Sequence, residues 1–90
     1  MKKLSDRVEV LAESIHLPTE AVLGDMKLSM VGGKRALVEN HKGILSFESS
    51  CVIVAARRGR LIFHGDGLYL AAMSEEWLII CGKIQAVEWE

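Results

Sequence analysis

The chain has 90 residues, which is the length of one small domain with a single hydrophobic core. Half of the residues are hydrophobic and 26% are charged, a balance typical of a globular protein and not of a disordered one. The formal net charge is −1, so the chain lacks the strong basic excess typical of nucleic-acid-binding proteins, and the balance favours a protein or small-molecule partner over a nucleic acid.

The N-terminal segment, residues 1–24, is expected to be helical. Apolar residues recur at helical spacing along one face: Leu4, Val8, Leu11 and Ile15. This pattern predicts a helix over residues 4–16, which Pro18 ends because a proline biases the residue before it toward extended geometry. Residues 19–24 are expected to add one more helical turn, with Thr19 as N-cap and Gly24 as the stop.

The remaining residues, 25–90, are expected to form an antiparallel β-domain. Short apolar runs recur there every eight or nine residues, separated by turn-forming residues, which is the rhythm of a compact antiparallel sheet. The predicted strands cover residues 26–30, 34–39, 44–47, 51–56, 60–64, 68–73 and 77–89. The fold class is therefore mainly β: a leading helix and about seven short strands in meander order, forming a curled roll, small sandwich or barrel.

Glycines mark the predicted turns and one predicted bend. Gly32-Gly33 is typical of a type I′ hairpin turn, whose two central residues both need positive φ. Gly65-Asp66-Gly67 is expected to turn the chain between two strands. Gly82 lies inside the long last strand, where it predicts a bulge or sharp bend that lets the strand cross from one sheet to another.

No residue cluster points to catalysis, a metal or a cofactor, and we expect no enzyme. Cys51 and Cys81 show no CxxC or zinc-type spacing and are interpreted as reduced thiols in the core. His41 and His64 are interpreted as solvated turn histidines, because no nucleophile or electrophile lies near them in the sequence. The serines occur without a nucleophile-elbow motif.

A basic cluster and two tryptophans are the candidates for an interaction surface. Arg57, Arg58 and Arg60 form this cluster, which suits an acidic partner, an anionic lipid or RNA, although solvated turn residues are the favoured interpretation. Trp77 and Trp89 flank the last strand, and indoles are enriched at interfaces as well as in cores. Four further residues would join the cluster if their turns share its end of the domain: Lys34, Arg35, His41 and Lys42.

Several hydrophobic and glycine-based stretches resemble the YabP/YqfC family of bacterial sporulation proteins, and its YqfC-type members in particular. They are Leu28-Ser-Met-Val-Gly32, Val38-Glu-Asn-His-Lys-Gly-Ile44, Gly59-Arg-Leu-Ile-Phe-His-Gly65, Leu68-Tyr-Leu70 and Leu78-Ile-Ile-Cys-Gly-Lys-Ile84. The resemblance implies a role in endospore formation in the mother-cell compartment and no catalytic or ligand-binding residues. It also implies a partner, because YqfC-type proteins are typically encoded beside the membrane-bound sporulation protein YqfD.

Two functions of different classes are therefore weighed. The first is a non-enzymatic interaction module in sporulation, which docks through a strand edge or an apolar and arginine-rich surface and could form homo-oligomers. The alternative is a small nucleic-acid-binding barrel of the Sm or OB type, since residues 78–82 loosely resemble an Sm-like motif. The chain shows no signal-peptide pattern, so a cytoplasmic protein, peripheral at the membrane through its partner, is expected.

Overall fold

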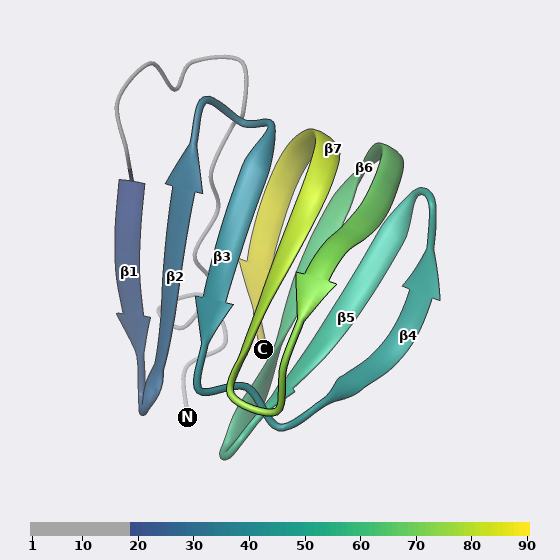
Figure 1. Cartoon of the computed structure of the whole chain (residues 1–90). Helices are drawn as coiled ribbons and strands as arrows, with labels where there is room; N and C mark the ends of the chain where they lie inside the picture. The colour runs from purple at the N-terminus through teal and green to yellow at the C-terminus, as the bar shows by residue number, and fades with distance from the viewer. Residues whose placement is uncertain (1–18) are drawn as a thin grey trace.

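The structure, a computed structural model, describes residues 19–90, which form one antiparallel sheet of seven strands and contain no helix (Figure 1). The predicted antiparallel sheet is thus confirmed, while the helix predicted over residues 4–16 lies outside the described residues. The strands are β1 (Thr19–Leu23), β2 (Met26–Val31), β3 (Arg35–Glu39), β4 (Ile44–Glu48), β5 (Cys51–Ala56), β6 (Gly59–Met73) and β7 (Trp77–Trp89).

The strand order corrects the predicted meander. The order is β1-β2-β3-β7-β6-β5-β4, so the last strand lies between β3 and β6, and the connection from β3 to β4 crosses to the far edge of the sheet. Pairing of β3 with β7 places Ala36 opposite Ile80 and Val38 opposite Leu78, and all four side chains are fully buried. This burial explains why β3 pairs with a strand distant in sequence and not with its neighbour β4.

The predicted helical turn at residues 19–24 is wrong, because this segment is strand β1. It pairs with β2 along its whole length, from Thr19 opposite Met30 to Leu23 opposite Met26. Gly24 has a φ of 66°, which suits the tight turn between the two strands. A five-residue segment has too few residues for its own helical preference to decide its structure, so pairing with the strongly alternating β2 prevails.

The two strands predicted over residues 60–64 and 68–73 are one continuous strand, β6. Gly65-Asp66-Gly67 does not reverse the chain but lies where the register between β6 and β7 shifts. The shift continues to Gly82 in β7, which has a φ of 122° and stands close to β6. A Cβ on Gly82 would lie 2.5 Å from the carbonyl oxygen of Gly67. The predicted irregularity at Gly82 is therefore present, but it bends a strand within one sheet.

Bending of β6 and β7 brings the two halves of the sheet face to face around one core (Figure 1). The inward positions of β2 alternate with outward ones, so Met26, Leu28 and Met30 are all buried. Two cross-strand rows contribute to the core: Leu28, Val38 and Leu78 from one half, and Val52, Phe63 and Val87 from the other.

Candidate functional site

The turns that carry the predicted basic cluster gather at one end of the domain, the lower end in Figure 1. Asp25, in the turn between β1 and β2, links three of the connections there. Its carboxylate accepts a hydrogen bond from Arg57 at 3.0 Å, and its carbonyl accepts one from the side-chain amide of Asn40 at 2.9 Å. The backbone N–H of Asn40 donates in turn to the carbonyl of Glu76. We call these four connections, around residues 24–25, 40–43, 57–58 and 74–76, the arginine end.

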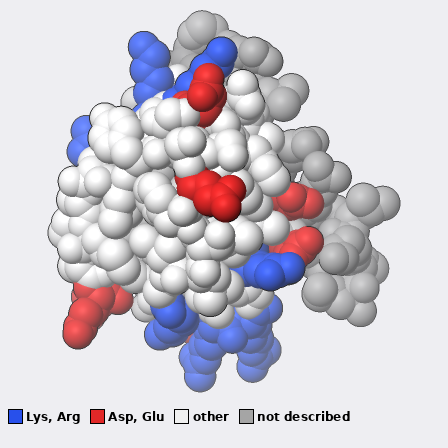
Figure 2. Space-filling view, turned by 90° about the vertical axis from the view of Figure 1, so that its right-hand side faces the viewer, with Lys and Arg blue, Asp and Glu red and all other residues white. Residues whose placement is uncertain are grey.

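Two of the three clustered arginines are paired with carboxylates. Arg57 pairs with Asp25, and an Arg60 guanidinium nitrogen lies 2.6 Å from a carboxylate oxygen of Glu90. Arg58 is exposed and forms no ion pair within residues 19–90. Several Lys and Arg side chains gather at the lower end of the face shown in Figure 2. The clustered arginines thus lie at one end of the domain, but carboxylates already compensate the charges of Arg57 and Arg60.

The four residues that could have enlarged the cluster divide between the two ends. His41 and Lys42 belong to the arginine end, where the Lys42 backbone N–H donates to the carbonyl of Ala55 at 2.8 Å. Lys34 and Arg35 follow the Gly32-Gly33 turn at the opposite end. Sequence alone could not make this division, because it depends on which turns the strand order brings together.

The two tryptophans differ in accessibility. Trp77 opens β7 at the arginine end, opposite Glu39, and is 39% exposed. Trp89 is half-buried and packs against the core. A Cβ on Gly59 would lie 2.7 Å from the Trp89 indole, so the absence of a side chain there makes room for the ring. Trp77 is therefore the more accessible of the two to a partner.

His41 is buried, with 4% of its surface exposed, so its interpretation as a solvated residue is wrong. Its Nδ1 accepts a hydrogen bond from the Gly43 backbone N–H at 2.9 Å, and its Nε2 donates to the carbonyl of Ser74, also at 2.9 Å. The imidazole thereby joins the connection that crosses to β4 with the turn between β6 and β7. Its role is structural, because both ring nitrogens are already used.

One arrangement of reactive residue types was missed by sequence reasoning. Cys51 lies opposite His64 in the β5–β6 register, and His64 Nε2 lies 3.1 Å from a Glu88 carboxylate oxygen. A cysteine, a histidine and a glutamate thus share the outer face of the sheet. No hydrogen bond joins Cys51 to His64 within residues 19–90, so the base–nucleophile contact of a thiol enzyme is not formed.

Among residues 19–90, the edge strand β4 has no neighbouring strand on the side away from β5. Its sequence, Ile-Leu-Ser-Phe-Glu, contains no lysine or proline, the residues that usually protect an exposed edge. Leu45 is 61% exposed and Phe47 is 41% exposed. Leu45 also lies where the β4–β5 register shifts, between the paired residues Ile44 and Ser46. The edge therefore offers both unpaired backbone groups and apolar side chains.

Comparison with known proteins places the chain in a family. Residues 23–90 match the sequence model of the YabP family, and this match covers more than half of the chain. The chain belongs to the YabP family. It is also 25% identical over 79 residues to the uncharacterized protein YqfC of Bacillus subtilis (strain 168), an alignment that covers 88% of this chain and 85% of YqfC. No solved structure matches the chain.

The region shared with the YabP family contains every surface described above. It begins at Leu23, the last residue of β1, and continues through β2 to β7. The arginine end and the β4 edge are therefore features of the part of the chain that defines the family match. Within residues 19–90 no helix is long and apolar enough to span a membrane.

Proposed function

We propose that this YabP-family protein is a non-enzymatic interaction module that acts during endospore formation. Membership of the family supports a sporulation-related role. The proposed partner is the membrane-bound sporulation protein of the YqfD type, which would hold this chain at the membrane in the mother-cell cytoplasm. Both the partner and the compartment come from the resemblance to YqfC-type proteins.

The open edge of β4 is the observation that carries the proposal. An edge strand can accept a further strand, and the outward N–H and C=O groups of β4 have no strand partner among the residues that the structure describes. The apolar side chains of Leu45 and Phe47 then supply pockets or anchors for residues of the incoming strand. Burial of both would add a hydrophobic contribution of roughly 1–3 kcal/mol each to the backbone hydrogen bonds.

The other sheet edge, β1, is less suited to this role. Its second residue, Glu20, forms an ion pair with Lys27 at 3.5 Å, and a charged side chain within a strand hinders docking along that edge, whereas the charge of β4, Glu48, lies at the last position of the strand. Val22 is 74% exposed, so β1 offers a matched apolar position for a control.

The test measures binding of the purified chain to the soluble part of the YqfD-type protein by biolayer interferometry. Leu45→Lys places a charge on the β4 edge and should weaken binding at least about tenfold, because the lysine must be desolvated beside the incoming strand. Val22→Lys makes the same change on β1 and should leave the affinity unchanged. Equal affinity of both variants and the unmodified chain would refute docking at β4.

A second copy of the chain is the competing occupant of the edge. Light scattering of the unmodified chain and of Leu45→Lys distinguishes the two cases. A monomer that binds the YqfD-type protein supports the proposal. A dimer that Leu45→Lys converts to a monomer, together with no binding of the YqfD-type protein, would replace the heterologous partner by self-association.

A further inference from the structure

We propose that the chain binds a single-chain anionic amphiphile, an apolar body with one carboxylate or phosphate group, in a groove at the end of the domain opposite the arginine end. The groove has a volume of about 740 Å³, within the range of about 300–1,000 Å³ usual for small-molecule sites. We call it the glycine groove. The inference concerns a surface separate from the β4 edge and does not depend on the proposed function.

The bend in β6 and β7 creates the glycine groove. The β7 strand pairs with β3 as far as Cys81 and then bends at Gly82, so its second half diverges from β3. The backbone carbonyls of Gly33 and Lys34 still accept hydrogen bonds from Ile84 and Gly82, at 2.9 and 3.2 Å. The Gly32-Gly33 turn therefore forms one wall of the groove and β7 another.

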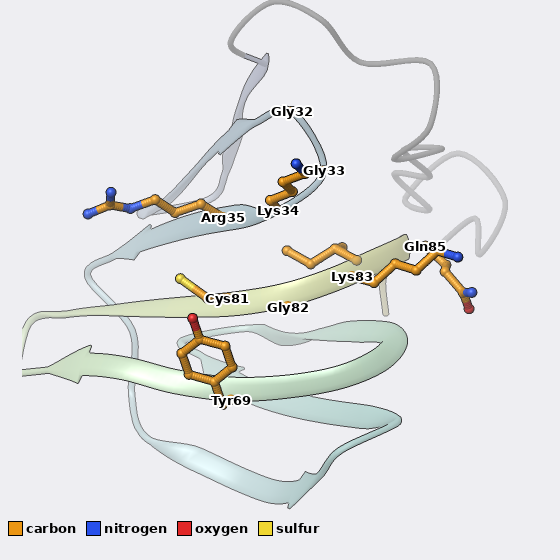
Figure 3. Close-up of a pocket in the computed structure, with 10 residues that line it drawn as sticks. Gly32, Gly33, Lys34, Arg35, Tyr69, Cys81, Gly82, Lys83 and Gln85 are labelled. Carbon is orange, nitrogen blue, oxygen red and sulfur yellow. The ribbon is translucent and has the colours of Figure 1, made fainter.

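Apolar surface dominates the lining. Tyr69 and Cys81 are paired across β6 and β7 and stand on the same side of the sheet (Figure 3). Tyr69 is 56% exposed, so its aromatic ring is accessible to a ligand. Val31, beside the turn on the adjoining part of this face, is 54% exposed. An apolar surface of this kind favours a ligand with a hydrocarbon or aromatic body.

Three cations line the same groove: Lys34, Arg35 and Lys83. None of them forms an ion pair with a carboxylate of residues 19–90, whereas at the arginine end two of the three clustered arginines, Arg57 and Arg60, are paired. An arginine guanidinium binds a carboxylate or phosphate through two parallel hydrogen bonds, and lysine adds a point charge. The uncompensated positive charge beside apolar surface thus selects a negatively charged head on an apolar body.

The probes are dodecanoate and dodecyl phosphate, tested by isothermal titration calorimetry below the concentrations at which they form micelles. Dodecyltrimethylammonium has the same chain and the opposite charge, and inorganic phosphate has the charge without the chain. We expect 1:1 binding of at least one anionic probe and no binding of either comparison compound. The two anionic probes distinguish a carboxylate ligand from a phosphate ligand.

Variants locate the binding. Arg35→Gln and Lys83→Gln should each lower the affinity for the anionic probe about fivefold, which is the effect of losing one partly exposed ion pair. Cys81→Phe should abolish binding by filling the groove from an outward-facing position. Arg58→Gln removes an exposed arginine at the arginine end and is the matched control, expected to leave the affinity unchanged.

The two cysteines provide a test that needs no substitution. A bound probe should slow iodoacetamide alkylation of Cys81, which lines the glycine groove, and leave Cys51 unaffected. Absence of binding by both anionic probes, equal binding of dodecyltrimethylammonium, or equal protection of both cysteines would overturn the proposal. Binding only to phosphatidylglycerol vesicles, with no 1:1 binding of a monomeric probe, would also overturn it in favour of a membrane surface.

Discussion

Substitution of Gly82 by alanine should destabilise the domain far more than the same change at Gly67. An alanine Cβ at position 82 would lie 2.5 Å from the Gly67 carbonyl oxygen and 2.9 Å from the Leu68 Cα, and both are backbone atoms. The positive φ of 122° costs a non-glycine residue about 1–3 kcal/mol, and relief of the overlap adds about 1–3 kcal/mol. We expect a loss of about 4 kcal/mol in the free energy of unfolding.

Thermal unfolding followed by circular dichroism measures this loss. For a domain of this size, 1 kcal/mol corresponds to about 4–8 °C, so Gly82→Ala should lower Tm by roughly 15–30 °C. Gly67 has a φ of 64°, but a Cβ added there would meet no atom within 4 Å, so Gly67→Ala should cost only about 1–2 kcal/mol. Equal Tm values for the two variants would refute the close approach of β6 and β7 at Gly82.

Three smaller experiments test other contacts. His41→Ala removes both hydrogen bonds of the imidazole and should cost about 2–4 kcal/mol in guanidinium unfolding, whereas His64→Ala, which removes only the exposed contact with Glu88, should cost under about 1 kcal/mol. Arg57→Ala breaks an exposed ion pair and should cost less than about 1 kcal/mol in the same assay. Cys51 and Cys81 lie on β5 and β7, which β6 separates, so a thiol titration of the unfolded chain should find both free and dithiothreitol should not change Tm.

Local sequence patterns correctly predicted strands in which buried and exposed residues alternate, and turns whose type requires particular residues such as glycine. Residues 26–30 alternate between apolar and polar, and the structure extends this strand by one residue as β2. Both glycines of the Gly32-Gly33 turn have positive φ, as the expected turn type requires. The strand order could not be predicted in this way, because insertion of β7 between β3 and β6 depends on packing between distant segments.

Two errors share a physical cause, since each comes from a local signal that pairing overrides. The sequence Thr-Glu-Ala-Val-Leu-Gly suits a capped helical turn, yet β2 holds it as a strand. Gly65-Asp66-Gly67 suits a turn, yet pairing with the neighbouring β7 keeps the segment within β6, where it forms an irregularity in the register. In both cases several cross-strand contacts outweigh a preference of a few tenths of a kcal/mol per residue.

The candidate sites were less predictable than the fold, because they depend on register. Arg57 and Asp25 meet only because the β1–β2 and β5–β6 turns share an end. No local signal distinguishes the buried His41 from the exposed His64, since both lie beside turn residues in the sequence. The glycine groove likewise requires the β3–β7 pairing, which a strand meander would not have formed.

The strand order, which the sequence did not predict, also explains why β4 lies at the edge of the sheet. Because β7 occupies the place beside β3, the chain must leave β3 at Asn40 and cross to the far side of β5. Asn40 has a φ of 68°, which asparagine tolerates better than most residues, and His41 then fixes the crossing connection to Ser74. The buried imidazole also accepts a hydrogen bond from the N–H of Gly43, the residue directly before β4. Loss of His41 should loosen β4 before it affects the β2–β3–β7 core, so hydrogen exchange in β4 should rise more than exchange in β3.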